Sequence, residues 1–141
     1  MAKIMFVGKT QVGKTTLIQA LKDEELSYRK TQAVEYHESI IDTPGEYIEN
    51  PRYYNAIVTM SFDADMLALV HDVTSDACYF PPGFGDMFNI KVIGILTKTD
   101  AEDGNRDRAE NWLKEAGASE IYSVSAYANE GIDALAELLK L

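Results

Sequence analysis

Short apolar runs alternate with longer amphipathic stretches along most of the chain. Continuous apolar runs such as 66–71 and 90–96 are typical of strands that are covered on both faces of a parallel sheet. The amphipathic stretches have the spacing of helices that pack on such a sheet. The predicted strands are 3–7, 33–38, 39–42, 66–71, 90–96 and 120–124, and the predicted helices are 14–22, 50–61, 105–116 and 132–141. This order predicts a three-layer α/β fold with a six-stranded, mainly parallel sheet.

Two helix boundaries carry clear local signals. Asn50-Pro51 is typical of a helix start, because a capping side chain is followed by proline at the first helical position. Gly117 follows the amphipathic stretch 105–116, and glycine readily adopts the left-handed conformation that ends a helix. We therefore expect one helix to begin at Asn50 and another to end at Gly117.

Two connections between elements are expected to be irregular or unusual. No helix fits between the predicted strands 33–38 and 39–42, so these strands are expected to form one antiparallel pair. The segment 72–89 contains Pro81-Pro82-Gly83, which predicts a loop or a short, broken helix. The polar segment 23–32 is predicted to be irregular.

The composition indicates one soluble domain. The chain has 141 residues and a net charge of −10, which argues against binding to nucleic acid or to anionic membranes. Cys78 is the single cysteine, so no internal disulfide can form, which suits the reducing cytosol. No apolar stretch reaches the length of a membrane span, and Met1-Ala2-Lys3 leads directly into the first strand without room for a targeting extension. We expect a cytoplasmic monomer or weak dimer.

The first predicted strand runs into a glycine-rich loop, Gly8-Lys9-Thr10-Gln11-Val12-Gly13-Lys14-Thr15. A strand, a G-x-x-x-x-G-K-[ST] loop and a helix in this order are typical of a phosphate-binding P-loop. Backbone N–H groups can turn towards phosphate oxygens, Lys14 adds a full charge at the β- and γ-phosphates, and Thr15 is a predicted Mg²⁺ ligand. The predicted phosphate-binding residues are Gly8, Lys9, Thr10, Gln11, Val12, Gly13, Lys14, Thr15 and Thr16.

A second motif follows the predicted strand 39–42. Asp42-Thr43-Pro44-Gly45 supplies a carboxylate and a backbone N–H group at the end of an apolar strand. Next to a P-loop, the Asp42 carboxylate is expected to hold a water on Mg²⁺, and the N–H of Gly45 to contact the γ-phosphate. The same composition also suits an ordinary turn.

Two further motifs, at the ends of the last two predicted strands, indicate which base is bound. In Thr97-Lys98-Thr99-Asp100, the Asp100 carboxylate matches the N1–H and amine of guanine, and the Lys98 stem is expected to lie along the base. Adenine would oppose that carboxylate with an acceptor nitrogen. In Ser125-Ala126, the N–H of Ala126 is expected to reach the guanine O6. Lys98, Asp100 and Ala126 are therefore predicted to contact the base, and Thr97 and Ser125 are predicted nucleotide-binding residues of the same motifs.

Together, the motifs resemble the five signature boxes of small Ras-like P-loop GTPases over nearly the whole chain. More closely, the segments 30–36, 42–50 and 80–84 resemble the EutP/PduV family of ethanolamine- and propanediol-utilisation proteins of bacteria. The resemblance implies a Ras-like fold and binding of GTP or ATP with Mg²⁺. It also implies a role in these catabolic pathways, association with bacterial microcompartments, and a shell or pathway protein as partner.

The resemblance also implies roles for single residues. Thr31 corresponds to the mobile-loop threonine that closes on Mg²⁺ and the γ-phosphate, so Lys14 and Thr31 are candidate catalytic residues. Glu46, the third candidate, stands where many Ras-like enzymes have a glutamine that orients the attacking water. Its carboxylate would act as a general base, repel the γ-phosphate or face solvent. Thr10 and Gln11 stand where glycine is frequent, and Thr97 replaces the usual asparagine. These departures imply slow hydrolysis more than weak binding.

Three functions stay open at this point. One is a GTP-dependent switch with slow hydrolysis, in which the segments 23–32 and 46–50 change order. Another is an ATP-dependent acetate kinase, to which the EutP side of the family has been linked and which would use the same P-loop. The third is a nucleotide-binding scaffold without catalysis. Tyr47, Tyr53 and Tyr54 either form a partner surface or pack against the sheet.

Overall fold

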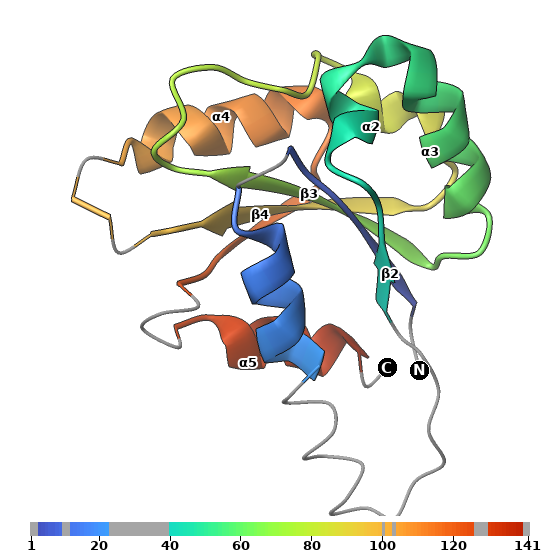
Figure 1. Ribbon diagram of the computed structural model, residues 1–141. Helices are drawn as coiled ribbons and strands as arrows, with labels where there is room; N and C mark the ends of the chain where they lie inside the picture. Colours follow the sequence, from blue (N-terminus) through green and yellow to red (C-terminus); the bar gives the residue numbers. More distant parts are fainter. Residues whose placement is uncertain are drawn as a thin grey trace, which may run out of the picture.

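A computed structural model of the protein describes residues 3–9, 12–22, 40–99, 101–102, 104–125 and 130–139 (Figure 1). Its strands are β1 (Ile4–Val7), β2 (Ile40–Asp42), β3 (Met66–Asp72), β4 (Lys91–Thr97) and β5 (Glu120–Ser123). They form one sheet in the order β2-β1-β3-β4-β5, and each paired strand is parallel to its neighbour. The predicted α/β fold is therefore confirmed.

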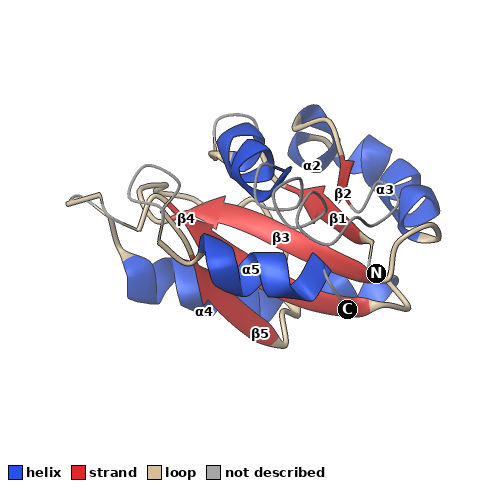
Figure 2. Cartoon of the chain, turned by 90° about the horizontal axis from the view of Figure 1, so that it is seen from below, coloured by secondary structure: helices blue, strands red, loops and turns tan. Residues whose placement is uncertain are grey.

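Helices cover both faces of this sheet. They are the helix over residues 14–22, α2 (Glu46–Glu49), α3 (Tyr54–Ser61), α4 (Arg106–Ala116) and α5 (Ile132–Leu139), with single turns of 3-10 helix at η1 (Pro51–Tyr53) and η2 (Phe84–Met87). Figure 1 shows the helix over 14–22 and α5 on one face, and α2, α3 and α4 on the other. Figure 2, seen from the first face, shows α5 in front of the strands. This is the three-layer arrangement expected from the sequence.

The two cores are separated by the strands themselves. Side chains alternate along a strand, so Ile4 and Phe6 of β1 lie in the core under the helix over 14–22 and α5. Met5 and Val7 lie in the opposite core, which also contains side chains of α3 and α4. All four of these residues are at most 2% exposed. β1 is thus covered on both faces, as its continuous apolar sequence predicts.

The position of β1 also fixes where a ligand can bind. β1 lies between β2 and β3, and its residues Phe6 and Val7 are in register with Asp42 and Leu69. β1 is followed by β2 on one side, whereas β3, on its other side, follows β2 through α2 and α3. In open parallel sheets, ligands bind beyond the carboxyl ends of the strands at such a reversal of the strand order. The segments that follow β1, β2, β3 and β4 therefore share one edge of the sheet.

Most boundary predictions agree with the structure. The Asn50 side chain accepts a hydrogen bond from the N–H of Arg52 at 3.1 Å, and Gly117 ends α4 with φ of +113°. The segment 72–89 is a loop that contains only the short η2. The predicted strand 33–38 lies outside the described residues, so the antiparallel sixth strand stays a prediction. In the part of the chain that the structure describes, no helix is long and apolar enough to cross a membrane.

Sequence analysis did not predict α2. This helix is a single turn after Pro44-Gly45, and its one buried residue is Ile48. One turn is too short to produce a periodic pattern of apolar positions. Its position matters because it begins directly after the Asp42 motif.

Candidate nucleotide-binding site

The glycines at the two ends of the P-loop are both required by its backbone. Gly13 has φ of +93°, in the left-handed region that side chains with a Cβ rarely adopt. A Cβ on Gly8 would lie 3.0 Å from the backbone oxygen of Val70, so the loop passes β3 too closely for a larger residue. Thr10 and Gln11 lie outside the described residues. The two described ends show a loop that turns tightly over the sheet edge.

Lys14 begins the helix after this loop, and protein oxygens hold its ammonium group. The residue is only 7% exposed, and its Nζ lies 2.7 Å from Oδ1 of Asp42. Nζ also donates to the backbone oxygen of Thr43. A buried ammonium group requires such partners, because its desolvation is costly. The fold therefore brings the P-loop motif and the Asp42 motif together at one point.

The Asp42 motif is itself anchored on β1. The hydroxyl of Thr43 donates to the backbone oxygen of Phe6 at 2.8 Å, and Thr43 is 1% exposed. The Asp42 side chain, by contrast, is 50% exposed. The chain then turns at Gly45 into α2, whose first residue, Glu46, is exposed. Thr43 thus holds the motif in place while the carboxylate stays open to solvent.

The predicted metal ligands differ in how far they are described. Thr15 and Thr16 lie in the first turn of the helix over 14–22 and are exposed. Thr15 follows Lys14 directly, and the Lys14 ammonium group contacts Asp42. Thr15 and the Asp42 carboxylate therefore belong to the same end of the P-loop. Thr31 lies outside the described residues, and its predicted role stays a prediction.

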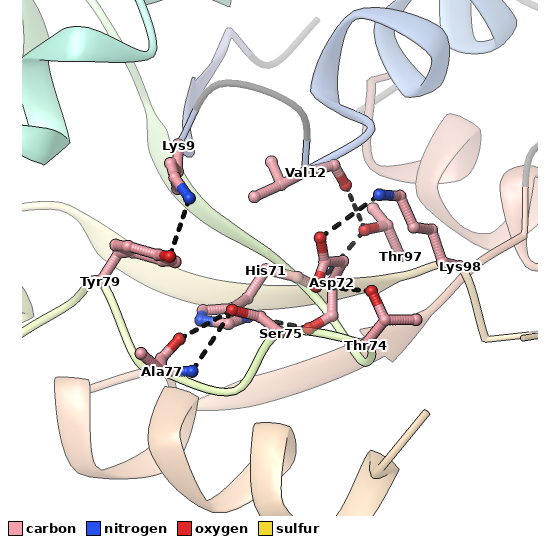
Figure 3. Close-up of polar contacts among 10 residues, drawn as sticks. All are labelled: Lys9, Val12, His71, Asp72, Thr74, Ser75, Ala77, Tyr79, Thr97 and Lys98. Carbon is pink, nitrogen blue, oxygen red and sulfur yellow. Dashed lines mark hydrogen bonds and ion pairs between the residues drawn. The ribbon is translucent and has the colours of Figure 1, made fainter. Parts of the chain in front are cut away.

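Thr97 supports the P-loop from below. Its hydroxyl donates to the backbone oxygen of Val12 and lies 3.5 Å from the backbone oxygen of His71 (Figure 3). Thr97 is 4% exposed, and Val12 is 2% exposed. Sequence analysis placed Thr97 among the nucleotide-binding residues, and its side chain is buried against the loop. The Thr97 side chain therefore positions the P-loop.

Lys98 lies beside the loop at the same end. It has φ of +57°, which is uncommon for a residue with a side chain, and its Nζ lies 3.4 Å from Oδ2 of Asp72. A Cβ added to Gly13 would lie 3.9 Å from the Cε atom of Lys98. The unusual backbone thus turns the half-exposed Lys98 side chain back along the P-loop, where a nucleotide would lie.

The last two motifs are tied to each other through the backbone. The hydroxyl of Thr99 donates to the backbone oxygen of Val124 at 2.9 Å. Ser125, which is 1% exposed, exchanges two backbone hydrogen bonds with Glu130 at 2.9 and 3.0 Å. Asp100 and Ala126, the predicted base contacts, lie outside the described residues. The residues on either side of them are nevertheless held together at the same edge of the sheet.

Comparisons with known proteins assign the family. The profile of the PduV-EutP family, described as ethanolamine utilisation and propanediol utilisation, matches residues 1–141. The chain belongs to this family. It is 42% identical to the propanediol utilization protein PduV of Citrobacter freundii over 134 residues, which are 94% of this chain and 89% of that protein. It is 36% identical over 142 residues to a protein of Escherichia coli (strain K12) named "Probable acetate kinase EutP", covering 99% of this chain and 89% of that protein.

A solved structure supports the fold of this PduV-EutP protein. The chain matches translation elongation factor SelB from Methanococcus maripaludis, in complex with the GTP analogue GppNHp, with a TM-score of 0.63. The identity is 23%, and the match covers 99% of this chain and 33% of SelB. The chain is thus a P-loop protein of the ethanolamine- and propanediol-utilisation family with the fold of GTP-binding proteins.

Two residues of the site in this family member were not singled out by sequence analysis. Asp72 ends the buried strand β3 and accepts hydrogen bonds from Lys98 and, at 3.3 Å, from the hydroxyl of Thr74. The rule that identified Asp42, a carboxylate at the end of an apolar strand, would also have identified Asp72. Tyr79 lies in the irregular segment after β3, and its hydroxyl accepts a hydrogen bond from Nζ of Lys9 at 2.8 Å. No local pattern in the sequence indicates that contact.

Lys9 therefore has a side-chain role that its motif does not predict. Its Nζ donates to the Tyr79 hydroxyl and also lies 4.3 Å from the centre of the Tyr79 ring (Figure 3). The hydrogen bond with Tyr79 is the main cause that raises the pKa of Lys9 above its usual value, with smaller contributions from the charges of Glu49 and Asp72. Lys9 is thus a cation at neutral pH at the first turn of the P-loop.

Proposed function

We propose that the chain binds GTP together with Mg²⁺ and hydrolyses it slowly, as a switch in ethanolamine or propanediol utilisation. The observation that carries this proposal is the buried Lys14 ammonium group, which Asp42 and Thr43 hold at the mouth of a tight glycine loop. Phosphate oxygens are the ligands that such a loop and lysine suit. Membership of the PduV-EutP family supports the assignment to these pathways.

The residues at this point also suit a magnesium ion. Thr15 and Asp42 offer a hydroxyl and a carboxylate, which are the hard oxygen ligands that Mg²⁺ prefers. Among the described residues, no cluster of three or more His, Cys, Asp or Glu side chains is placed to hold a metal ion. Mg²⁺ does not require such a cluster, because it is held by one or two protein oxygens together with waters and phosphates. When bound, the ion would neutralise charge on the β- and γ-phosphates.

The preference for guanine is supported by the arrangement of the fourth and fifth motifs. The Lys98 side chain lies along the P-loop, where it can cover one face of a base. Thr99 ties this motif to Val124, directly before Ser125-Ala126. With Asp100 as the acceptor for the guanine N1–H and amine, an adenine base would leave a carboxylate unpaired.

The contacts of Lys14 suggest how nucleotide binding is linked to α2. Lys14 is paired with Asp42 and with the backbone of Thr43. Phosphates would bind the same ammonium group, so nucleotide binding would change the contacts of the Asp42 motif. α2 follows directly, and Tyr47 within it stacks on Tyr53 with ring centres 5.1 Å apart. This half-exposed aromatic pair is a surface for a shell or pathway protein that senses the bound nucleotide.

A second candidate function is phosphoryl transfer to acetate. Relatives at 36–37% identity are named probable acetate kinases, and such a reaction would use the same P-loop and Mg²⁺. The specific observation in its favour is the cationic Lys9 beside the loop, which suits an anionic acceptor. Glu46, which stands where many Ras-like enzymes have a glutamine that orients the attacking water, is exposed in the first turn of α2.

One assay separates these functions. The purified protein is incubated with Mg²⁺ and either GTP or ATP, with and without acetate, while phosphate and acetyl phosphate are measured. Slow GTP turnover in the absence of acetate is the expected result for the switch. Formation of acetyl phosphate when acetate is added would show the second function, and nucleotide consumption that occurs only with acetate would contradict the switch. Tight nucleotide binding without turnover would contradict both. Lys14→Met serves as the inactive control.

A further inference from the structure

We propose that Lys9 and Tyr79 form a binding site for a small carboxylate beside the terminal phosphate of the nucleotide. The carboxylate would be the acceptor of the phosphoryl group. The inference therefore rests on the nucleotide site proposed above, and it names the residues that would bind the acceptor in the second candidate function. Neither the P-loop motif nor the family assigns such a role to these side chains.

The pair lies on the side of the loop away from the base motifs. Figure 3 shows Lys9 and Tyr79 at one side of the view and Thr97 and Lys98 at the other, with Val12 between them. Lys9 follows β1, whose residue Phe6 is in register with Asp42 of the neighbouring strand, so it lies at the end of the strand next to the Asp42 motif. The terminal phosphate is expected at that motif, so Lys9 and Tyr79 lie next to it.

In the part of the chain that the structure describes, no carboxylate oxygen lies within 4.0 Å of Nζ of Lys9. The ammonium group donates a hydrogen bond to the neutral Tyr79 hydroxyl. An ammonium group has three donors, so donors remain available. The Tyr79 oxygen accepts from Lys9, which leaves its own O–H free to donate. Lys9 and Tyr79 together thus offer a positive charge and two kinds of donor.

Tyr79 is held in this position by buried aromatic residues. Its ring stacks on His71, with centres 5.8 Å apart and an angle of 28° between the planes. His71 is fully buried, and its Nδ1 lies 2.9 Å from the backbone oxygen of Asp72. A carbonyl oxygen only accepts, so Nδ1 carries the hydrogen and the ring is fixed in one tautomer. Trp112 packs on the same ring at 5.5 Å. The donors are therefore preorganised.

The chemistry of these donors fits a carboxylate better than a water molecule. An attacking water must lose a proton, but an ammonium group and a phenol are donors and do not take one. A carboxylate is already deprotonated, and its two oxygens match one N–H and one O–H group. In the step we infer, a carboxylate oxygen attacks the γ-phosphorus as the bond to the bridging oxygen breaks. The electron pair leaves with the nucleoside diphosphate, an acyl phosphate forms, and no proton is transferred.

The experiment uses acetate as the probe and the single tryptophan, Trp112, as the reporter. Fluorescence of Trp112 is titrated with sodium acetate against sodium chloride of equal ionic strength, with and without a non-hydrolysable Mg²⁺–nucleotide. Acyl phosphate is trapped with hydroxylamine in parallel assays with GTP and ATP. Nucleotide affinity is measured separately by calorimetry. The variants are Lys9→Met, Tyr79→Phe and, as a matched control, Lys91→Met at the start of β4.

Saturable responses to acetate are expected in the wild type for both the fluorescence and the product. Lys9→Met should raise the acetate concentration for half-saturation by about tenfold or more, because a hydrogen bond to a charged group is lost. Tyr79→Phe should raise it by about three- to tenfold. Tyr79→Phe should leave nucleotide affinity within about twofold of the wild type, and Lys91→Met should match the wild type in both measurements.

Several results would overturn the inference. If Lys9→Met weakens nucleotide binding and leaves the acetate response unchanged, Lys9 belongs to the phosphate cradle. If Lys91→Met has the same effect as Lys9→Met, only overall charge matters. Absence of any acetate response in a wild type that binds nucleotide would also refute it. The wild type could instead bind no nucleotide but still respond to acetate, with Lys9→Met abolishing that response. This result would support the carboxylate site and contradict the proposed function.

Discussion

The two ends of the P-loop are held in different ways. At one end, the Thr97 hydroxyl donates to the backbone oxygen of Val12, and both residues are nearly inaccessible to solvent. At the other end, Lys9 is half-exposed and donates to the hydroxyl of Tyr79. The first contact satisfies a buried carbonyl group and therefore stabilises the fold. The second contact leaves a charge and several donors available, so it is suited to a ligand.

Lys14 begins the helix that follows the loop, and its removal should have the largest effect. Lys14→Met removes the ammonium group that would bind the β- and γ-phosphates, and each hydrogen bond to a charged group is typically worth about 1.5–3 kcal/mol. We expect the affinity for Mg²⁺–GTP to fall by roughly 100-fold or more. Titration calorimetry with a non-hydrolysable analogue measures this, and circular dichroism shows whether the variant is folded. An affinity within about threefold of the wild type, in a folded variant, would show that Lys14 does not bind the phosphates.

The buried end is tested by Thr97→Val. This change keeps the shape of the side chain and removes its hydroxyl, which leaves the buried oxygen of Val12 without its partner. We expect the free energy of unfolding to fall by about 1–3 kcal/mol in urea titrations. Thr97→Ser retains the hydroxyl and should stay closer to the wild type.

Lys9→Met gives the matching test at the exposed end. Because the Lys9 contact does not satisfy a buried group, the unfolding midpoint should equal that of the wild type. Equal destabilisation by Thr97→Val and Lys9→Met would remove the distinction between the two ends.

The sequence predicted the parts of the site that depend on local motifs. The glycines, Lys14 and Thr15 follow from one continuous loop, and Asp42 and Thr97 follow from their places at strand ends. Parallel strands align these ends at one edge, so the meeting of Lys14 with Asp42 could be anticipated. The roles of Thr31, Asp100 and Ala126 stay predictions.

Other features depend on contacts between distant parts of the chain. Lys9 and Tyr79 are 70 residues apart, and the irregular segment around Tyr79 has no periodicity that would orient its side chain. The buried role of Thr97 was equally hidden, because a threonine at a strand end suits both a ligand contact and a contact with the adjacent loop. The single turn α2 was missed because its one buried residue makes no pattern.

Calorimetry tests directly whether this site binds a guanine nucleotide with Mg²⁺. GTP and ATP are titrated into the wild-type protein, each with Mg²⁺ and again with EDTA. We expect GTP with Mg²⁺ to bind on the order of 100-fold more tightly than ATP, since adenine would leave the Asp100 carboxylate unpaired. We also expect EDTA to weaken GTP binding. Equal affinities for the two nucleotides, or tighter binding of ATP, would show that the site does not select guanine.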